Sequence, residues 1–322
     1  WFEGQATGGC ANDVRGPYLG PDGWVYWCKG TSVVTEARYE RPGRGAFVTK
    51  AQHVFRCRPD GSEFEPLVTG GMDNPVEVAF TAGGEALFTT TQFQNPGLPR
   101  TDGLFHAVYG GVYPKDLASV HEHPWSGPTL LPVLASWGAS APAGITCYQS
   151  DIFGPQFQHN VFVAHFNFHK VTRHKLTAAG ATFASAEEDF LTSTDVGFHP
   201  TDVLEDADGS LLVIETGGWY RFCCPSSSLF KPEVLGAIYR IRRSGAERSE
   251  DPRGQRLNWH ALSPSEAVQL LADPRPAVRW RAVQLLAQQA NDAVPAVAEV
   301  IRSHPDAVAR RHAVWAACRI AQ

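Results

Sequence analysis

A repeated turn followed by a short strand is the sequence feature that most constrains how this chain folds. Asp-Gly or Gly-Gly stands before a run of apolar residues in 20–27, in 81–90 and again in 205–214. Glycine adopts the positive φ of a tight hairpin turn, so each stretch predicts a turn followed by a strand. Recurring strand–turn–strand units indicate radial or linear repetition. The sequence therefore predicts a β-propeller.

Short runs of aromatic and β-branched residues, bounded by Gly and Pro, continue to about residue 244. They amount to about three or four blades of roughly four strands each. A closed propeller usually needs more blades, and the chain opens on Trp1 directly in strand-like sequence, so we expect earlier blades to precede Trp1. The predicted strands are 24–28, 46–48, 53–57, 76–80, 86–90, 104–109, 144–148, 161–166, 170–176, 201–205, 211–215 and 237–241.

The pattern changes near residue 245. Residues 245–260 are charged and irregular, which is typical of a linker. The following residues become helical in pattern, because Ser263 and Glu266 form a capping box and Pro264 stands at the first helical position. The sequence therefore predicts a propeller domain at 1–244, a linker at 245–260 and a helical domain at 261–322.

The helical domain contains an internal repeat. Residues 278–287 align with residues 309–318, at an offset of 31 residues. Paired helices at such a period indicate an α-solenoid, most similar to HEAT repeats. The last helix runs to Gln322 without a polar cap, so we expect the solenoid to be truncated as well.

Composition excludes several classes of protein. The net charge of −5 and the lack of a long basic block argue against a nucleic-acid-binding face. No run of apolar residues approaches the roughly 18 that a membrane span needs. The seven cysteines contain no Cys-x-x-Cys, so neither a zinc ribbon nor an attached c-type haem is expected in this segment.

Several stretches of the predicted propeller resemble the soluble quinoprotein glucose/sorbosone dehydrogenases. The resemblance covers most of residues 10–242. Joined to HEAT repeats, the chain is similar to the large membrane-bound dehydrogenase-type proteins of planctomycetes. The stretches that carry the resemblance are 141–153, 160–164, 171–176, 202–216 and 236–241.

This resemblance implies a six-bladed propeller that holds pyrroloquinoline quinone (PQQ) over its central channel. It also implies a calcium ion, a His that takes a proton from a sugar hydroxyl, and a periplasmic or other extracytoplasmic location. In such chemistry the cofactor performs the redox step and the protein supplies orientation, charge and a base. The first hypothesis is therefore a PQQ-type dehydrogenase of sugars or related alcohols.

The second hypothesis is a non-catalytic module, and it follows from departures at family positions. Asn12 stands where the resemblance places the basic His, and Asp73 stands where it places an Arg. His199 and Thr201 replace two further Arg residues. In this hypothesis the channel binds a glycan or a protein, and the HEAT-like helices dock a partner. Both hypotheses remain open at the level of sequence.

Two loops supply candidate cofactor-binding residues at the channel mouth. In the first loop, Asp13 is a candidate base, Asn12 is a candidate cofactor-binding residue, and Arg15 is a candidate ligand of an anionic cofactor. The alternative is an Asp–Arg pair that braces the loop. In the second loop, Asp73 and Asn74 offer oxygen atoms to calcium or to sugar hydroxyls, or else form an Asx turn before a strand.

Two later segments complete the candidate site. His199 and Asp202 are candidates for proton transfer, with a blade-to-blade hydrogen bond as the alternative. Trp219 and Tyr220 are candidates for stacking on a sugar ring or a quinone, with a packed lid as the alternative. The acidic residues of 206–209 resemble part of a calcium loop, but we predict a hairpin turn there because the later Glu is missing.

Overall fold

The computed structural model describes residues 14–30, 36–41, 43–91, 101–113, 118–124, 127, 129–218, 231–247 and 249–322. Within them, most strands belong to four antiparallel sheets, and β3 (Ala37–Tyr39) pairs separately with β4 (Phe47–Thr49). The first sheet has the order β1 (Val14–Leu19), β2 (Val25–Lys29), β5 (His53–Cys57), β6 (Glu65–Thr69). The second has the order β7 (Asn74–Phe80), β8 (Ala86–Thr91), β9 (Asp102–His106), β10 (Ala135–Trp137). The third has the order β11 (Pro142–Cys147), β12 (Val161–His165), β13 (Lys170–Ala179), β14 (Thr182–Thr192). The fourth has the order β15 (Pro200–Glu205), β16 (Leu211–Glu215), β17 (Ala237–Ile241).

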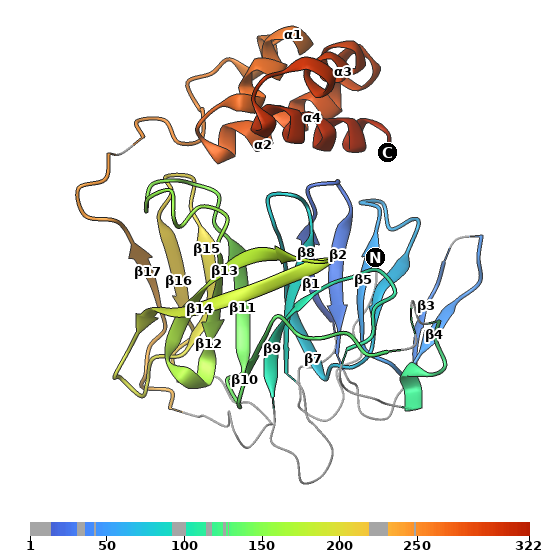
Figure 1. Cartoon of the computed structure of the whole chain (residues 1–322), viewed down its shortest axis with the longest axis vertical. Coiled ribbons are helices and arrows are strands. Elements are labelled where there is room, and N and C mark those ends of the chain that lie inside the picture. Colours follow the sequence, from blue (N-terminus) through green and yellow to red (C-terminus); the bar gives the residue numbers. More distant parts are fainter. Residues whose placement is uncertain are drawn as a thin grey trace.

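These sheets are the blades of a β-propeller, as predicted. The first strand of each blade packs on the first strand of the next, in the order β1, β7, β11, β15 (Figure 1). Apolar clusters fill the space between successive blades; Val54 and Phe88, for example, belong to one cluster that joins the first two blades. We call these first strands the inner strands, and the place where they converge the hub.

The three repeated turns form as the sequence predicts. Gly23, Gly84 and Gly209 have φ values of +85°, +92° and +75°. Each donates its N–H to the carbonyl oxygen three residues earlier and closes the hairpin between the first and second strands of its blade. Only glycine adopts such φ values without strain, so the turn motif sets the blade hairpins.

A small helical region follows the propeller. Its helices are α1 (Pro264–Ala267), α2 (Pro276–Gln289), α3 (Val294–Ser303) and α4 (Ala307–Ile320), with 3₁₀ turns between them. The capping box of Ser263 and Glu266 is present, as predicted. Buried Val, Leu and Ala side chains from all four helices form one core. The limits of the three predicted domains stay a prediction, although the strands end at Ile241 and α1 begins at Pro264.

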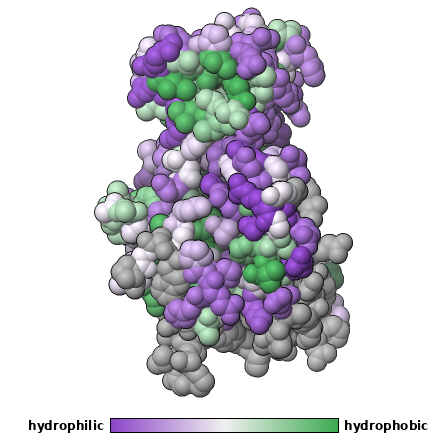
Figure 2. Space-filling model, turned by 90° about the vertical axis from the view of Figure 1, so that its right-hand side faces the viewer, coloured by the Kyte–Doolittle hydropathy of each residue, from purple (hydrophilic) through white to green (hydrophobic). Residues whose placement is uncertain are grey.

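The helices cover one end of the propeller, the end that carries the glycine turns (Figure 1). From α4, Arg319 Nε and Nη2 donate to the carbonyl oxygens of Pro21 and Gly20 at 3.0 and 2.9 Å. From α2, Trp280 Nε1 donates to Gln149 Oε1 at 3.3 Å. Figure 2 shows mostly hydrophilic side chains where the helical region meets the propeller. Polar contacts therefore form part of this junction.

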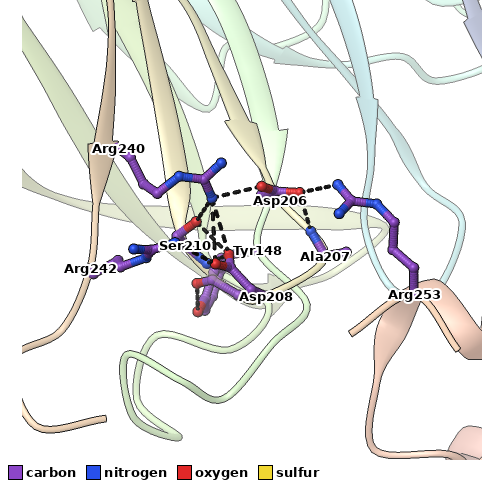
Figure 3. A network of polar contacts seen from close by, with 9 residues as sticks. Tyr148, Asp206, Ala207, Asp208, Ser210, Arg240, Arg242 and Arg253 are labelled. Atoms are coloured by element: carbon purple, nitrogen blue, oxygen red, sulfur yellow. Dashed lines mark hydrogen bonds and ion pairs between the residues drawn. The ribbon is translucent and has the colours of Figure 1, made fainter. Parts of the chain in front are cut away.

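The turn of the fourth blade is tied to the linker by a charge network (Figure 3). Asp206 accepts hydrogen bonds from Arg240 Nη1 at 2.6 Å and from Arg253 Nη2 at 2.5 Å. Burial alone would raise the pKa of Asp206, but these guanidinium groups hold it below its usual value. The acidic turn at 206–209 is thus a hairpin turn, as predicted. Its aspartates have arginine partners, and Arg253 connects the linker to the turn.

We expect Gly84→Ala to lower the free energy of unfolding by about 2 kcal/mol. An added Cβ would lie 2.5 Å from the ring of Trp315 on α4, in addition to the strain of a positive φ. Urea denaturation measures the loss. Gly61→Ala is a matched control, because Gly61 has a φ of +84° and no atom within 4 Å of an added Cβ. Equal losses in the two variants would contradict the packing of Trp315 on this turn.

Candidate functional site in the propeller hub

The hub brings together polar side chains from three inner strands: Arg15, Tyr18, Asn74, Glu77 and Asp202. Arg15 Nε donates to Asn74 Oδ1 at 3.3 Å, and Tyr18 Oη donates to the carbonyl oxygen of Val76 at 2.9 Å. Both hydrogen bonds join the first blade to the second. They place one guanidinium and one phenol beside the first strand of the second blade.

Two carboxyl groups from different blades meet in the hub. Glu77 of β7 and Asp202 of β15 share a side-chain hydrogen bond, although they belong to the second and fourth blades. Glu77 Oε2 also accepts the backbone N–H of Ile145 on β11 at 3.2 Å. The pair therefore connects three inner strands.

Burial and mutual contact favour one shared proton on this pair at neutral pH. Ionised carboxylates can only accept hydrogen bonds, so a bond between two carboxyl groups requires one of them to keep its proton. Burial and the neighbouring charge of Asp202 raise the pKa of Glu77 well above its usual value. Burial also raises the pKa of Asp202. The hub thus offers both a hydrogen-bond donor and several acceptors at one place.

Gly144 makes room for this pair. A Cβ at Gly144 would lie 2.0 Å from Asp202 Oδ1 and 2.5 Å from Asp202 Cα. Only glycine allows β11 and β15 to approach so closely at this level of the hub. A glycine at position 144 is therefore needed for the Asp202 carboxyl group to lie where it does.

The structure places the candidate residues of the second loop in and beside the hub. Asn74 meets Arg15, as described above. Asp73 is buried just before β7, and its backbone N–H donates to the carbonyl oxygen of Thr91 at 2.9 Å. The binding roles predicted for these residues stay predictions. Asn12, Asp13, Trp219 and Tyr220 lie outside the described residues.

His199 immediately precedes β15 and makes no hydrogen bond to Asp202 among the residues described. Its Nδ1 donates to the carbonyl oxygen of Phe166 at 3.0 Å, and its ring stacks on the Phe166 ring at 4.4 Å. This is the blade-to-blade hydrogen bond that the sequence left as the alternative. Since Nδ1 carries the proton, Nε2 presents a buried lone pair without a hydrogen-bond partner in the described structure. Burial lowers the pKa of His199 and keeps the ring neutral.

Glu77 was not among the residues predicted from sequence. The available signal was a single acidic residue between Val76 and Val78 in a predicted strand. A charged residue in an inner strand indicates a hub position, because its side chain needs a polar partner when buried. Its partner, Asp202, was predicted to be a site residue on independent grounds.

The hub residues described here do not fit PQQ. A cofactor with three carboxylate groups requires several cations, typically Arg. Arg15 is the only cation of the five hub residues, and Glu77 and Asp202 supply acidic groups close by. Among the described residues, no three or more His, Cys, Asp or Glu side chains gather in a group that could hold a metal ion.

The comparisons with known proteins agree with a propeller joined to a helical solenoid. Residues 1–244 match the model of a family described as a domain of unknown function, DUF7133, and the chain belongs to that family. Residues 264–322 match HEAT repeats. No curated protein sequence matches the chain. None of the described helices is long and apolar enough to cross a membrane.

The similar solved structures include glucose dehydrogenase-type propellers. One is described as an oxidoreductase (glucose dehydrogenase) from Thermus thermophilus, with 17% identity and a TM-score of 0.43, covering 69% of this chain and 63% of that one. A second glucose dehydrogenase has 17% identity and a TM-score of 0.47, with coverages of 72% and 64%. Regucalcin, a calcium-binding protein from Agrobacterium tumefaciens, has 11% identity and a TM-score of 0.36, with coverages of 71% and 75%. The chain thus spans less than two thirds of the length of both glucose dehydrogenases.

Proposed function

We propose that this protein binds a neutral sugar or polyol in its propeller hub, without redox chemistry. The observation that carries the proposal is the meeting of the Glu77 and Asp202 carboxyl groups in the hub, next to Gly144 and Ile145 of β11. Such a pair both donates and accepts hydrogen bonds, as a hydroxyl-rich ligand requires. The amide of Asn74 is on β7 with Glu77, and the guanidinium of Arg15 donates to it from β1.

Net charge favours a neutral ligand over an anionic one. One carboxyl group of the pair keeps its proton, so Arg15 and the remaining carboxylate offset each other. An anionic ligand would have to displace the Arg15–Asn74 hydrogen bond and lie next to a carboxylate, at a cost in desolvation and repulsion. A neutral hydroxyl group avoids both costs.

The competing proposal is an extracytoplasmic PQQ-dependent sugar or alcohol dehydrogenase. Its support is the sequence resemblance to quinoprotein dehydrogenases, carried by residues 141–153, 160–164, 171–176, 202–216 and 236–241. The chemistry of the hub residues does not favour it, because a tricarboxylate lacks partners among them. The two proposals agree on the class of ligand and differ on whether the ligand is oxidised.

Calorimetric titration with glucose, galactose and sorbitol tests the proposed function. We expect Glu77→Ala to weaken binding about tenfold or more, because it removes hydrogen bonds to the ligand and leaves Asp202 without its partner. Glu77→Gln should retain most of the affinity, since an amide also donates and accepts. Glu233→Gln, at an exposed position, is the matched control and should bind like the wild type.

A second arm of this experiment separates binding from oxidation. Protein supplied with PQQ and calcium should bind the sugar but should not reduce an electron-accepting dye. Sugar-dependent dye reduction would contradict the non-redox proposal and support the dehydrogenase. Failure of every sugar and polyol to bind would contradict the proposed ligand class.

A docking role for the helices is a separate part of the proposal. HEAT repeats often mediate protein interactions, and Figure 2 shows apolar side chains gathered on one face of the helical region. Val314 of α4 is 39% exposed. If the α4 surface docks a protein, Val314→Asp should weaken cross-linking to that partner and leave sugar binding unchanged. Equal cross-linking by the variant would contradict docking on this helix.

A further inference from the structure

A cleft of about 500 Å³ lies between the propeller and the helices that cover it. Residues from all four inner strands line it, and α2 and α4 contribute the opposite wall. Glu77 of the hub pair is one of the lining residues, so the cleft reaches the hub. A volume of this order is typical of small-molecule sites in proteins.

The helical wall presents an aromatic ring to this cleft. Trp280 of α2 lines the cleft, and its Nε1 donates to Gln149 Oε1 at 3.3 Å. This hydrogen bond holds the indole against the propeller and fixes the orientation of its ring. A large, rigid aromatic ring with an amide beside it is suited to stacking on the apolar face of a sugar.

The other polar groups of the cleft are uncharged or already engaged. Gln284 of α2 lines the cleft with an exposed amide that makes no hydrogen bond to a described residue. Arg319 is the only cation among the lining residues, and it donates to the carbonyl oxygens of Gly20 and Pro21. The cleft therefore offers hydrogen-bonding amides and hydroxyls without a cation that is available to bind an anion.

We propose that the sugar or polyol enters the hub through this cleft, stacks on Trp280 and so bridges the propeller and the helical region. The inference rests on the proposed function for the class of ligand, and it adds that the helical region forms part of the binding site. Glu77 then contacts one end of the ligand and Trp280 the other. A bound ligand would hold the two regions together in addition to the polar contacts of Arg319.

The test compares Trp280→Ala with Trp280→Phe, using the tightest-binding member of the glucose, galactose and sorbitol panel as the probe. Trp280→Ala should weaken binding about tenfold, whereas Trp280→Phe should keep most of the affinity because it keeps an aromatic face. Trp24→Phe is the matched control, because Trp24 packs on Arg56 and Arg58 outside the cleft. This variant should bind the probe like the wild type.

Limited proteolysis gives a second readout that a merely structural role for Trp280 would not produce. The same probe should slow trypsin cleavage at Arg253 and Arg256 in the linker of the wild type, and it should not do so in Trp280→Ala. Binding by Trp280→Ala equal to that of the wild type, with loss in Glu77→Ala, would overturn this inference and leave the proposed function standing. Binding of no probe to the wild type would overturn both.

Discussion

Gly144→Ala should lower the free energy of unfolding by about 3 kcal/mol, and it should abolish sugar binding in any fraction that still folds. The added Cβ would lie 2.5 Å from Asp202 Cα, a backbone atom that cannot move aside without shifting β15. The inner strands of the third and fourth blades would separate, and the bond between Glu77 and Asp202 would be lost. Urea denaturation and calorimetry measure the two effects.

Gly138→Ala is the matched control for this variant. Neither glycine has a φ in the positive range, and an added Cβ at Gly138 has no atom within 4 Å. The control should therefore change the free energy of unfolding by less than about 1 kcal/mol. Similar stability of the two variants would show that the close approach of β11 to Asp202 is absent.

Glu77→Gln should remove a pH dependence from the stability of the wild type. The folded state keeps the proton of Glu77 above the pH at which the unfolded state releases it, because burial raises the folded pKa. The folded state then binds more protons, so the free energy of unfolding falls as pH rises above the ordinary glutamate pKa. Gln does not titrate but still donates to Asp202. Between about pH 5 and pH 8 the wild type should lose about 2 kcal/mol more than the variant.

Denaturation of both proteins across this pH range measures the difference. Titrations of groups outside the Glu77–Asp202 pair cancel in the comparison, because they are common to the two proteins. Glu233→Gln, at an exposed position, should follow the wild-type curve. Parallel curves for the wild type and Glu77→Gln would contradict an elevated pKa of Glu77 in the folded state.

Much of the propeller could be predicted from local sequence. The turns at Gly23, Gly84 and Gly209 follow directly from glycine before an apolar strand, and all the predicted strands are present. The inner strand β1 was not predicted, because Gly16 and Pro17 interrupt its apolar pattern. Pro is tolerated there since β1 is the first strand of its sheet and has a free edge. The strands β3, β6, β10 and β14 were also missed. The exposed acidic residues of β14 resemble a loop.

Less of the candidate site than of the fold could be predicted from the sequence. The sequence points to Arg15 and Asn74 because their loops precede predicted strands, and to Asp202 because it could form a couple with His199 across Pro200. The structure brings all three to the hub. The role of Glu77 in the site follows only from its contact with Asp202, two blades away. No local sequence pattern predicts such a contact. The position of the helices over the glycine turns could not be predicted from the sequence either, because it depends on tertiary contacts such as that of Arg319 with the first turn.

Infrared spectroscopy at neutral pH tests the central claim most directly, since a protonated carboxyl group has a C=O stretch that an ionised one lacks. The difference spectrum between the wild type and Glu77→Gln should contain this band, and the band should persist until the pH rises well above the ordinary glutamate pKa. A difference spectrum with only carboxylate bands at neutral pH would contradict a proton shared between Glu77 and Asp202.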